Sequence, residues 1–239
     1  MKALVLAAGF GKRLGKITTE IPKPLIKVGD EPILGFCLAE LWNAGVTEVV
    51  INTHHLAPQI DEFIESYETE LIINLSHEEK LLGTAGTLKR HLEFLSDEDF
   101  LVMHADNYFV DSIAALVADH KSRQVGRYGT LGTFVTKDPK NCGVLVLNSD
   151  KTIREFHEKV MHPPTNVANS AIYVFTPETR EQLLNLTEGE NDISKHLIPK
   201  IMSGLYTHGF NGLFVDIGTP EGLKVANDYE REFTRSRIS

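Results

Sequence analysis

The sequence is poor in cysteine and has no long apolar run. Its two cysteines, Cys37 and Cys142, stand far apart among 239 residues. They make neither a disulfide framework nor a zinc-type spacing, which favours a reducing, cytoplasmic setting. No apolar stretch approaches the roughly 18 residues of a membrane-spanning helix. The run over residues 3–8 is too short for a signal-peptide core and is broken by Gly9.

Positive charge is also scarce, which excludes one class of partner. The chain has 24 Lys and Arg against 33 Asp and Glu, a net charge of −9. Such a balance argues against nucleic-acid binding through bulk electrostatics. The first 30 residues are the exception, because they hold only two acids against the basic residues Lys2, Lys12, Arg13, Lys16, Lys23 and Lys27. This basic segment predicts a local anion site, and a solvated surface patch is the alternative.

The first half of the chain alternates between strand-like and helix-like patterns. Apolar runs typical of buried strands cover residues 3–8, 48–52, 71–75 and 100–104. Helical patterns lie between and after them, at residues 33–44, 58–67, 83–94 and 111–121. Strands that alternate with helices need crossover connections, so we expect a mainly parallel sheet. With 42% hydrophobic and 24% charged residues, the composition is that of an ordinary globular domain.

The second half of the chain has a different pattern. Short strands are predicted at residues 130–135, 143–147, 153–156 and 171–175, as antiparallel or mixed additions to the sheet. Two Thr-Pro-Glu segments, starting at Thr176 and Thr219, predict helices with threonine as N-cap and proline at the first helical position. The last helix is expected over about residues 220–233. Without a linker or repeat, one α/β domain over residues 1–239 is the simplest organisation.

A glycine-rich, basic loop follows the first strand. Its sequence is Leu6-Ala7-Ala8-Gly9-Phe10-Gly11-Lys12-Arg13-Leu14. Small residues let backbone N–H groups approach a ligand closely, and Lys12 and Arg13 add charge suited to a polyphosphate. The spacing of a P-loop is absent. A dinucleotide fingerprint matches only Gly9 and Gly11, with Leu14 at the third glycine position. An ordinary tight turn is the third interpretation of the loop.

Together with Pro22-Lys23-Pro24-Leu25, this loop resembles the signature of the sugar-phosphate nucleotidylyltransferases. That signature is Leu-Ala-x-Gly-x-Gly-x-Arg-Leu, with Pro-Lys-Pro about eight residues later. Later segments also resemble family segments, in the same order: Gly83-Thr84-Ala85-Gly86, Asp106-Asn107, Gly143-Val144, Glu158-Lys159, Asn169-Ser170-Ala171-Ile172-Tyr173 and Asp216-Ile217-Gly218-Thr219-Pro220. The likeness is greatest to mannose-1-phosphate and heptose-1-phosphate guanylyltransferases. The chain departs from the pattern at Ala105 and Ala171, where the family has glycine, at Val160, where proline is common, and at Phe214, an offset aromatic.

The resemblance implies a Rossmann-like fold and an enzyme. The fold is a mixed, mainly parallel sheet flanked by helices, in a single domain with a nucleotide-binding half (about 1–122) and a sugar-phosphate-binding lobe (about 123–233). The reaction joins an NTP to a sugar 1-phosphate, gives an NDP-sugar and releases pyrophosphate. It needs Mg²⁺ and involves neither nucleic acid nor membrane. A homo-oligomer is compatible with the family.

The resemblance also assigns roles to individual residues. Arg13 and Lys23 would neutralise the triphosphate, and Asp106 and Asp216 would hold Mg²⁺, which prefers carboxylate and phosphate oxygens. The catalytic set is thus Arg13, Lys23 and Asp106. The nucleotide would be bound by Leu6, Ala7, Ala8, Gly9, Gly11, Lys12, Glu78, Gly83 and Thr84. The sugar phosphate would be bound by Gly143, Glu158, Lys159 and Asn169.

Glu78 bears on the choice of base. It lies five residues before Gly83, where many pyrimidine-using relatives have glutamine. A carboxylate only accepts hydrogen bonds, and guanine offers adjacent N1–H and N2–H₂ donors, so Glu78 favours GTP with a mannose- or heptose-type sugar. Uracil N3–H could also donate to it, which keeps a UTP- or CTP-using relative open, including a phosphocholine-type cytidylyltransferase.

Two further alternatives are weighed against the site residues. A non-catalytic module that binds nucleotide sugars for regulation could lose a site residue without penalty, yet Arg13, Lys23, Asp106, Lys159 and Asp216 are all present. A dehydrogenase on a dinucleotide fold does not explain Arg13 or Pro22-Lys23-Pro24.

Overall fold

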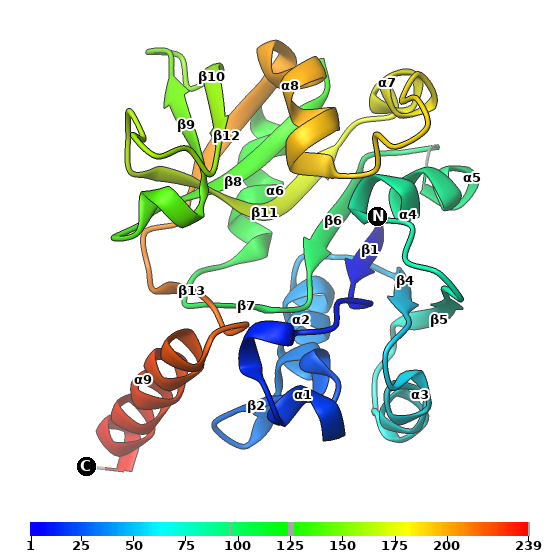
Figure 1. The fold of residues 1–239 in the computed structure, drawn as a ribbon, viewed down its shortest axis with the longest axis vertical. Helices are drawn as coiled ribbons and strands as arrows, with labels where there is room; N and C mark the ends of the chain where they lie inside the picture. Colours follow the sequence, from blue (N-terminus) through cyan, green and yellow to red (C-terminus); the bar gives the residue numbers. More distant parts are fainter. Residues whose placement is uncertain (96, 124–126, 239) are drawn as a thin grey trace.

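The computed structural model describes residues 1–95, 97–123 and 127–238. Among these residues one nine-stranded mixed sheet forms the centre of the molecule, with the order β10-β9-β11-β6-β1-β4-β5, while β8 pairs with β11 and β12 with β8 (Figure 1). Its strands are β1 (Lys2–Leu6), β4 (Glu48–Thr53), β5 (Ile72–His77), β6 (Phe100–His104), β8 (Gly129–Val135), β9 (Gly143–Leu147), β10 (Ile153–Glu158), β11 (Val167–Phe175) and β12 (Leu205–Gly209).

The N-terminal half of the sheet is parallel, as the alternating pattern predicts. β1 pairs in parallel with both β4 and β6, and β4 pairs in parallel with β5. Ala3, Leu4 and Val5 of β1 are fully buried because this strand is covered on both faces. The carboxyl ends of these strands therefore meet at one edge of the sheet, where loops can gather around a ligand.

The C-terminal half adds the expected antiparallel pairing. β11 runs antiparallel to β6, β8 and β9, and β9 and β10 form an antiparallel hairpin.

Two apolar clusters cover the two faces of the sheet, since successive side chains of a strand point to opposite sides. Ala3 and Val5 belong to one cluster with α2 (Ile33–Asn43), and Leu4 belongs to the other with α4 (Thr84–Arg90).

The other helices cover the sheet or extend from it. They are α1 (Ile17–Glu20), α3 (Ala57–Ser66), α5 (Leu92–Leu95), α6 (Ile113–Ser122), α7 (Thr179–Leu184), α8 (Ile198–Ile201) and α9 (Pro220–Ile238), with the short turns η1 (Lys12–Leu14), η2 (Lys23–Leu25), η3 (Pro139–Asn141) and η5 (Met202–Gly204) and the π-helical η4 (Ile193–Leu197). A small hairpin, β2 (Lys27–Val28) with β3 (Glu31–Pro32), precedes α2. Within the described ranges, no helix has both the length and the apolar character needed to cross a membrane.

Two helix predictions are corrected by the structure. The helix expected over residues 83–94 is divided into α4 and α5 at His91. The helix expected to begin at Thr176 is α7, which begins at Thr179 with Glu178 as N-cap. The Thr176 hydroxyl instead donates to the carbonyl oxygen of Arg127 at 2.9 Å. Thr176 is thus oriented by a tertiary contact and lies before the helix that it was expected to cap.

A small two-stranded sheet was not predicted, and it positions the site. β7 (Asn107–Phe109) pairs antiparallel with β13 (Phe214–Asp216), and Asn107 lies opposite Asp216. Residues that are a hundred positions apart in sequence are thereby placed side by side at the carboxyl end of β6 (Figure 1). α9 follows β13 directly and begins at Pro220, as predicted, but it continues beyond residue 233.

The N-cap of α9 gives a testable stability prediction. Thr219 Oγ1 accepts a hydrogen bond from the backbone N–H of Gly222 at 3.0 Å. Thr219→Ala removes this acceptor, so we expect the free energy of unfolding to fall by about 1 kcal/mol. Urea unfolding followed by circular dichroism measures the change. Thr219→Ser keeps the oxygen and serves as the control, and equal stability of both variants would contradict the role as N-cap.

Candidate active site

The glycine-rich loop and the carboxyl end of β1 line a first pocket. Most residues predicted to bind nucleotide lie on its wall: Leu6, Ala7, Ala8, Gly9, Glu78, Gly83 and Thr84. Lys23 and Asp106 line it as well. Gly11 and Lys12 do not line this pocket. Gly11 has φ 64 and supplies the turn before η1, and Lys12 Nζ lies 5.3 Å from the centre of the Phe10 ring.

A buried polar network holds the wall of the first pocket. Asn52, at the carboxyl end of β4, accepts from Ala7 N–H through Oδ1 at 2.8 Å and donates to Glu78 Oε1 at 2.9 Å. Thr87 donates to the same Glu78 oxygen at 2.5 Å, and Leu82 N–H donates to Glu78 Oε2 at 3.0 Å. Asn52 and Glu78 are 4% and 1% exposed, so their hydrogen bonds are made inside the protein.

This network changes the role in base recognition that was predicted for Glu78. Its Oε1 already accepts two hydrogen bonds, and only Oε2 has an acceptor position left. The two-oxygen contact to guanine predicted from the sequence is therefore not available in this arrangement. Asn52 was missed by the sequence analysis. Its signal is a polar residue that ends the otherwise apolar strand segment Val49-Val50-Ile51.

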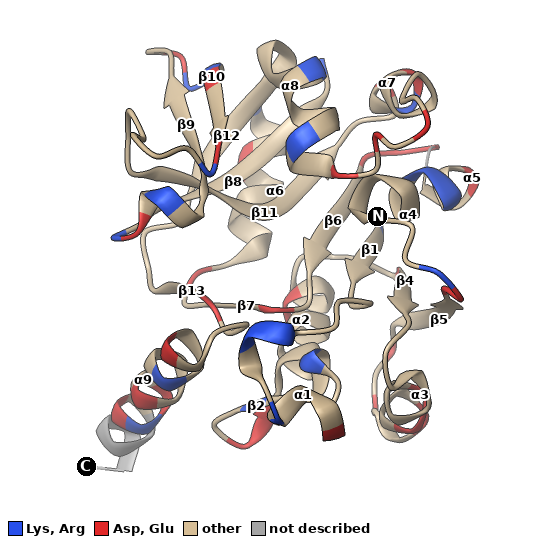
Figure 2. Ribbon diagram, in the orientation of Figure 1, with Lys and Arg blue, Asp and Glu red and all other residues tan. Residues whose placement is uncertain are grey.

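Four charged side chains meet beside the first pocket. Lys23 Nζ lies 2.5 Å from Asp106 Oδ2 and 3.3 Å from Asp216 Oδ1, and Arg13 donates to Asp216 Oδ2 at 2.7 Å. The residues predicted to be catalytic or to bind metal are thus brought together by η1, η2 and the β7–β13 pair. In Figure 2 the basic ribbon that follows β1 lies near the acidic segments next to the β7 and β13 labels.

Lys23 is the buried member of this cluster. Its side chain is 8% exposed, whereas the Arg13 side chain is 62% exposed. Burial raises the pKa of Asp216, but the charges of Lys23 and Arg13 outweigh this effect and hold its pKa below the ordinary range. Asp216 therefore stays ionised near neutral pH beside the Lys23 and Arg13 side chains.

The chemistry of the two carboxylates fits a hard divalent cation. The described part of the chain has no group of three or more His, Cys, Asp or Glu side chains arranged for a metal. Mg²⁺ does not need one, because it is commonly held by one or two carboxylates together with substrate phosphates. Asp106 and Asp216 offer such a pair, and their oxygens converge on the Lys23 ammonium.

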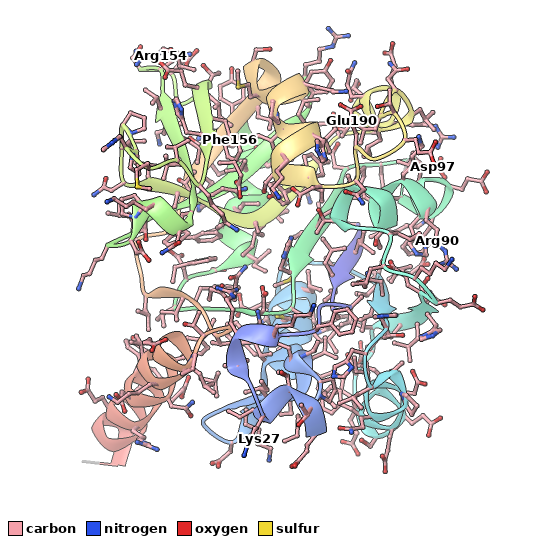
Figure 3. The ribbon with its side chains drawn as sticks, viewed as in Figure 1. Lys27, Arg90, Asp97, Arg154, Phe156 and Glu190 are labelled. Atoms are coloured by element: carbon pink, nitrogen blue, oxygen red, sulfur yellow. The ribbon has the colours of Figure 1, made fainter. Side chains whose placement is uncertain are left out.

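A second pocket adjoins the charged cluster on the side of the C-terminal lobe. All four residues predicted to bind the sugar phosphate line it, Gly143, Glu158, Lys159 and Asn169, as do Arg13, Asp106 and Asp216. Gly143 has no room for a side chain, since a Cβ there would lie 2.5 Å from Glu158 Oε2 and 2.7 Å from the ring of Phe156. Figure 3 labels Phe156 in the C-terminal lobe. The glycine is required by its neighbours as much as by a ligand.

Two of the polar side chains in the second pocket are constrained. Burial raises the pKa of Glu158, and Lys159, whose Nζ is 3.7 Å away, offsets this only in part. Asn169 Nδ2 donates to the Tyr173 hydroxyl at 2.8 Å and to Ser194 Oγ at 3.3 Å. Both amide hydrogens of Asn169 are thus used within the protein. Its Oδ1 accepts from the Ala171 N–H at 2.9 Å, which leaves one acceptor position for a ligand.

Ser194 is a site residue that the sequence analysis missed. It lies in η4, the π-helical turn, and lines the second pocket beside Asn169. π-Helical turns are rare and occur often at functional sites. No sequence pattern marked this turn, since its geometry depends on contacts with the neighbouring helices.

Two residues that line the second pocket have strained backbones. Lys159 has φ 51 and Ala171 has φ 56, the left-handed region that glycine adopts freely. For other residues this conformation costs about 1–2 kcal/mol. Ala171 stands where the family pattern has glycine, so the left-handed backbone explains that glycine, while the alanine here accepts the strain.

Three features thus lie together on a mainly parallel sheet: the glycine-rich loop at the end of β1, the Lys23 ammonium between two aspartates, and the adjoining polar pocket. Residues 2–232 match the family model described as "Nucleotidyl transferase", and the chain belongs to this family. The resemblance found in the sequence is thereby confirmed.

Individual relatives agree with this assignment. Mannose-1-phosphate guanyltransferase of Schizosaccharomyces pombe is 31% identical over 229 residues, which are 92% of this chain and 62% of that protein. Mannose-1-phosphate guanyltransferase beta-A of Xenopus laevis is 32% identical, with the same two shares. The chain thus spans about 62% of the length of these curated relatives.

A solved structure confirms the predicted fold class. A crystal structure from Bacillus anthracis, named for glucose-1-phosphate thymidylyltransferase and in complex with sucrose, superposes with a TM-score of 0.86 at 24% identity. The superposition covers 97% of this chain and 95% of that one, so the single-domain, mainly parallel architecture is shared along almost the whole length.

Proposed function

We propose that this protein is a nucleotidylyltransferase that converts an NTP and a sugar 1-phosphate to an NDP-sugar and pyrophosphate. One observation carries the proposal. Lys23, Arg13, Asp106 and Asp216 form a single charged cluster at the junction of two pockets. Two anionic substrates that occupied these pockets would meet at this cluster.

The chemistry of this reaction suits the residues at hand. A phosphate oxygen of the sugar 1-phosphate forms a bond to the α-phosphorus of the NTP, and the bond from that phosphorus to the pyrophosphate oxygen breaks. The attacking oxygen is already an anion, so no strong general base is required. The task is to bring two polyanions together and to stabilise charge in the transition state, which cations and positioning achieve. Arg13 and Lys23 would supply this positive charge.

Asp106 and Asp216 would hold Mg²⁺ for this reaction. When bound there, the ion would neutralise negative charge on the phosphate oxygens. Asp106 would serve both substrates, because it lines both pockets. Lys23 would counterbalance the two carboxylates and donate to phosphate oxygens that enter between them.

The division of labour between the two halves of the chain is part of this proposal. The first pocket is lined only by residues up to Asp106, which supports a nucleotide-binding half over about residues 1–122. The second pocket takes most of its wall from residues between Phe134 and Asp216, which supports a sugar-phosphate-binding half over about residues 123–233.

For the substrates, we favour GTP and a manno-configured sugar 1-phosphate. The named activity of the Schizosaccharomyces pombe and Xenopus laevis relatives supports this choice. Glu78 supports guanine less strongly than its sequence position suggested, because only its Oε2 can accept a further hydrogen bond. That single acceptor would also suit the N3–H of uracil, so a UTP-using enzyme is the second candidate.

The setting of the reaction is inferred from general features. Both Cys37 and Cys142 are free thiols, which supports a reducing, cytoplasmic location. With a net charge of −9, we expect small anionic substrates and neither nucleic acid nor a membrane surface as partner. A homo-oligomer stays an expectation from the family.

Pyrophosphate release tests the proposed function directly. With Mg²⁺ present, GTP, UTP, CTP, dTTP and ATP are each offered with a panel of sugar 1-phosphates and with phosphocholine. We expect release with GTP and a mannose- or heptose-type sugar 1-phosphate, abolished by EDTA. Release with another NTP would keep the reaction and reject the base assignment. Nucleotide binding without any release would instead favour the regulatory module.

A further inference from the structure

We propose that Ala171 determines which sugars the second pocket accepts. Its methyl group forms a fixed part of the pocket wall and limits the size of the ring substituent that can face β11. This inference rests on the proposed function, because it takes the occupant of the second pocket to be a sugar 1-phosphate.

The first observation is the strained backbone of Ala171. Among the described residues, the non-glycine residues with positive φ are Leu56, Lys151, Lys159 and Ala171. Two of them, Lys159 and Ala171, line the second pocket. Glycine would adopt the conformation of Ala171 without steric cost. Strain retained at a pocket wall, where the smaller residue would relieve it, indicates that the methyl group has a use.

The second observation is that the Ala171 backbone is held in place. The pairing of β11 with β8 shifts in register between Asn169 and Tyr173, which marks an irregularity in the strand. Within it, Ala171 N–H donates to Asn169 Oδ1 at 2.9 Å, and Asn107 Nδ2 donates to the Ser170 carbonyl oxygen at 3.0 Å. These hydrogen bonds hold the backbone that carries the Cβ of Ala171.

The third observation concerns the residues that line the second pocket beside the Ala171 methyl group. Asn169, Ser170, Ala171 and Ser194 all line the second pocket, and Ser170 is the buried member of this set, at 1% exposed. A close approach to Gly132 shows where Ser170 points, since a Cβ on that glycine would lie 2.5 Å from Ser170 Oγ. Asn169 therefore offers the pocket a polar side chain, and Ala171 offers it an apolar one.

A rigid methyl group in a pocket wall sets a steric limit. A difference of one methyl or methylene in such a wall changes discrimination between substrates by about 10–200-fold. We therefore expect the native pocket to favour a hexose 1-phosphate that carries only hydroxyl groups over the corresponding 2-acetamido hexose 1-phosphate. Removing the methyl group would make room for the larger substituent and take a contact away from the smaller ring.

The experiment compares Ala171→Gly with a matched control, Lys151→Gly. Both positions have a left-handed backbone. Lys151, however, is exposed and lies in the turn that connects β9 to β10, at the opposite end of this hairpin from Gly143 and Glu158. Both variants are expected to relieve strain and to raise the melting temperature by about 2–3 °C. Only Ala171→Gly should shift the ratio of kcat/KM between the acetamido and the plain hexose 1-phosphate, by about tenfold toward the acetamido sugar.

The outcomes separate this inference from the proposed function. An active Ala171→Gly variant with an unchanged ratio would overturn the inference, and so would a ratio that shifts equally in Lys151→Gly. An Ala171→Gly variant without a gain in melting temperature would remove its premise of strain. If the unmodified protein turns over no pair of substrates, the proposed function fails. Calorimetric binding of the same two sugar 1-phosphates then decides the inference, which requires a change of preference in Ala171→Gly alone.

Discussion

Lys23→Met will lower kcat/KM by about a thousandfold. Lys23 Nζ is the buried cation between Asp106 and Asp216, and methionine fills the space without the charge. Removing one member of a buried, hydrogen-bonded charge pair typically costs about 2–5 kcal/mol, which corresponds to a factor of about 30–5,000. The triphosphate would also meet two carboxylates that no neighbouring ammonium offsets. Steady-state pyrophosphate release measures the loss.

The matched control is Lys27→Met. Lys27 is four residues further along the same basic segment, but it is exposed on β2, away from both pockets (Figure 3). This variant should keep full activity. Melting curves of both variants establish that they are folded. A folded Lys23→Met protein with more than a tenth of the native kcat/KM would contradict the role given to this ammonium.

Asp106→Asn is expected to lower kcat by a similar factor while the protein stays folded. Asparagine keeps the size of the side chain and an oxygen that Lys23 can still reach, so the fold loses little. The charge needed to hold a divalent cation is lost, and Asp216 alone would bind it weakly. We expect the Mg²⁺ concentration for half-maximal rate to rise by at least about tenfold, a change of about 1.4 kcal/mol in binding.

A surface aspartate provides the comparison for this variant. Asp228 lies on α9 and pairs with Lys224 at 2.7 Å, outside both pockets. Asp228→Asn removes the same charge from the protein and should leave the Mg²⁺ dependence unchanged. If Asp106→Asn shows the native Mg²⁺ dependence together with native kcat, the carboxylate pair does not hold the ion.

The sequence was sufficient to predict the parallel half of the sheet and the members of the charged cluster. Ala3, Leu4 and Val5 form a continuous apolar run, which is typical of a strand that is buried on both faces. β1 is such a strand. Arg13 and Lys23 were found because the glycine-rich loop and Pro22-Lys23-Pro24 resemble the family signature, and Asp106 and Asp216 because their segments resemble later family segments. These signals are local, so they survive without knowledge of the tertiary structure.

The parts that were missed depend on contacts between distant segments. β7 and β13 are three residues long each, too short to show a period of two, yet their pairing places Asp106 beside Asp216. Ser194 enters the second pocket through a π-helical turn that no composition marks. Thr176 has the sequence of an N-cap, but its hydroxyl donates to the carbonyl oxygen of Arg127, and the helix begins only at Thr179.

Glu78 shows a limit of a different kind. The sequence gives its residue type and its place before Gly83, and from these a contact to the base was inferred. The sequence does not show that Asn52, Thr87 and the Leu82 backbone N–H already donate hydrogen bonds to this carboxylate. The sequence identifies the functional group at a position. The number of hydrogen bonds that this group can still accept depends on the neighbours that the fold places around it.

The contact between Arg13 and Asp216 joins residues 203 positions apart, and it has a consequence for synthesis of the protein. A ribosome makes Arg13 first and Asp216 only 203 residues later. A nascent chain therefore carries the basic loop without the second carboxylate until β13 has been made. Catalytic competence would arrive in one late step, when β13 docks on β7, and prematurely terminated chains would be unable to consume NTP.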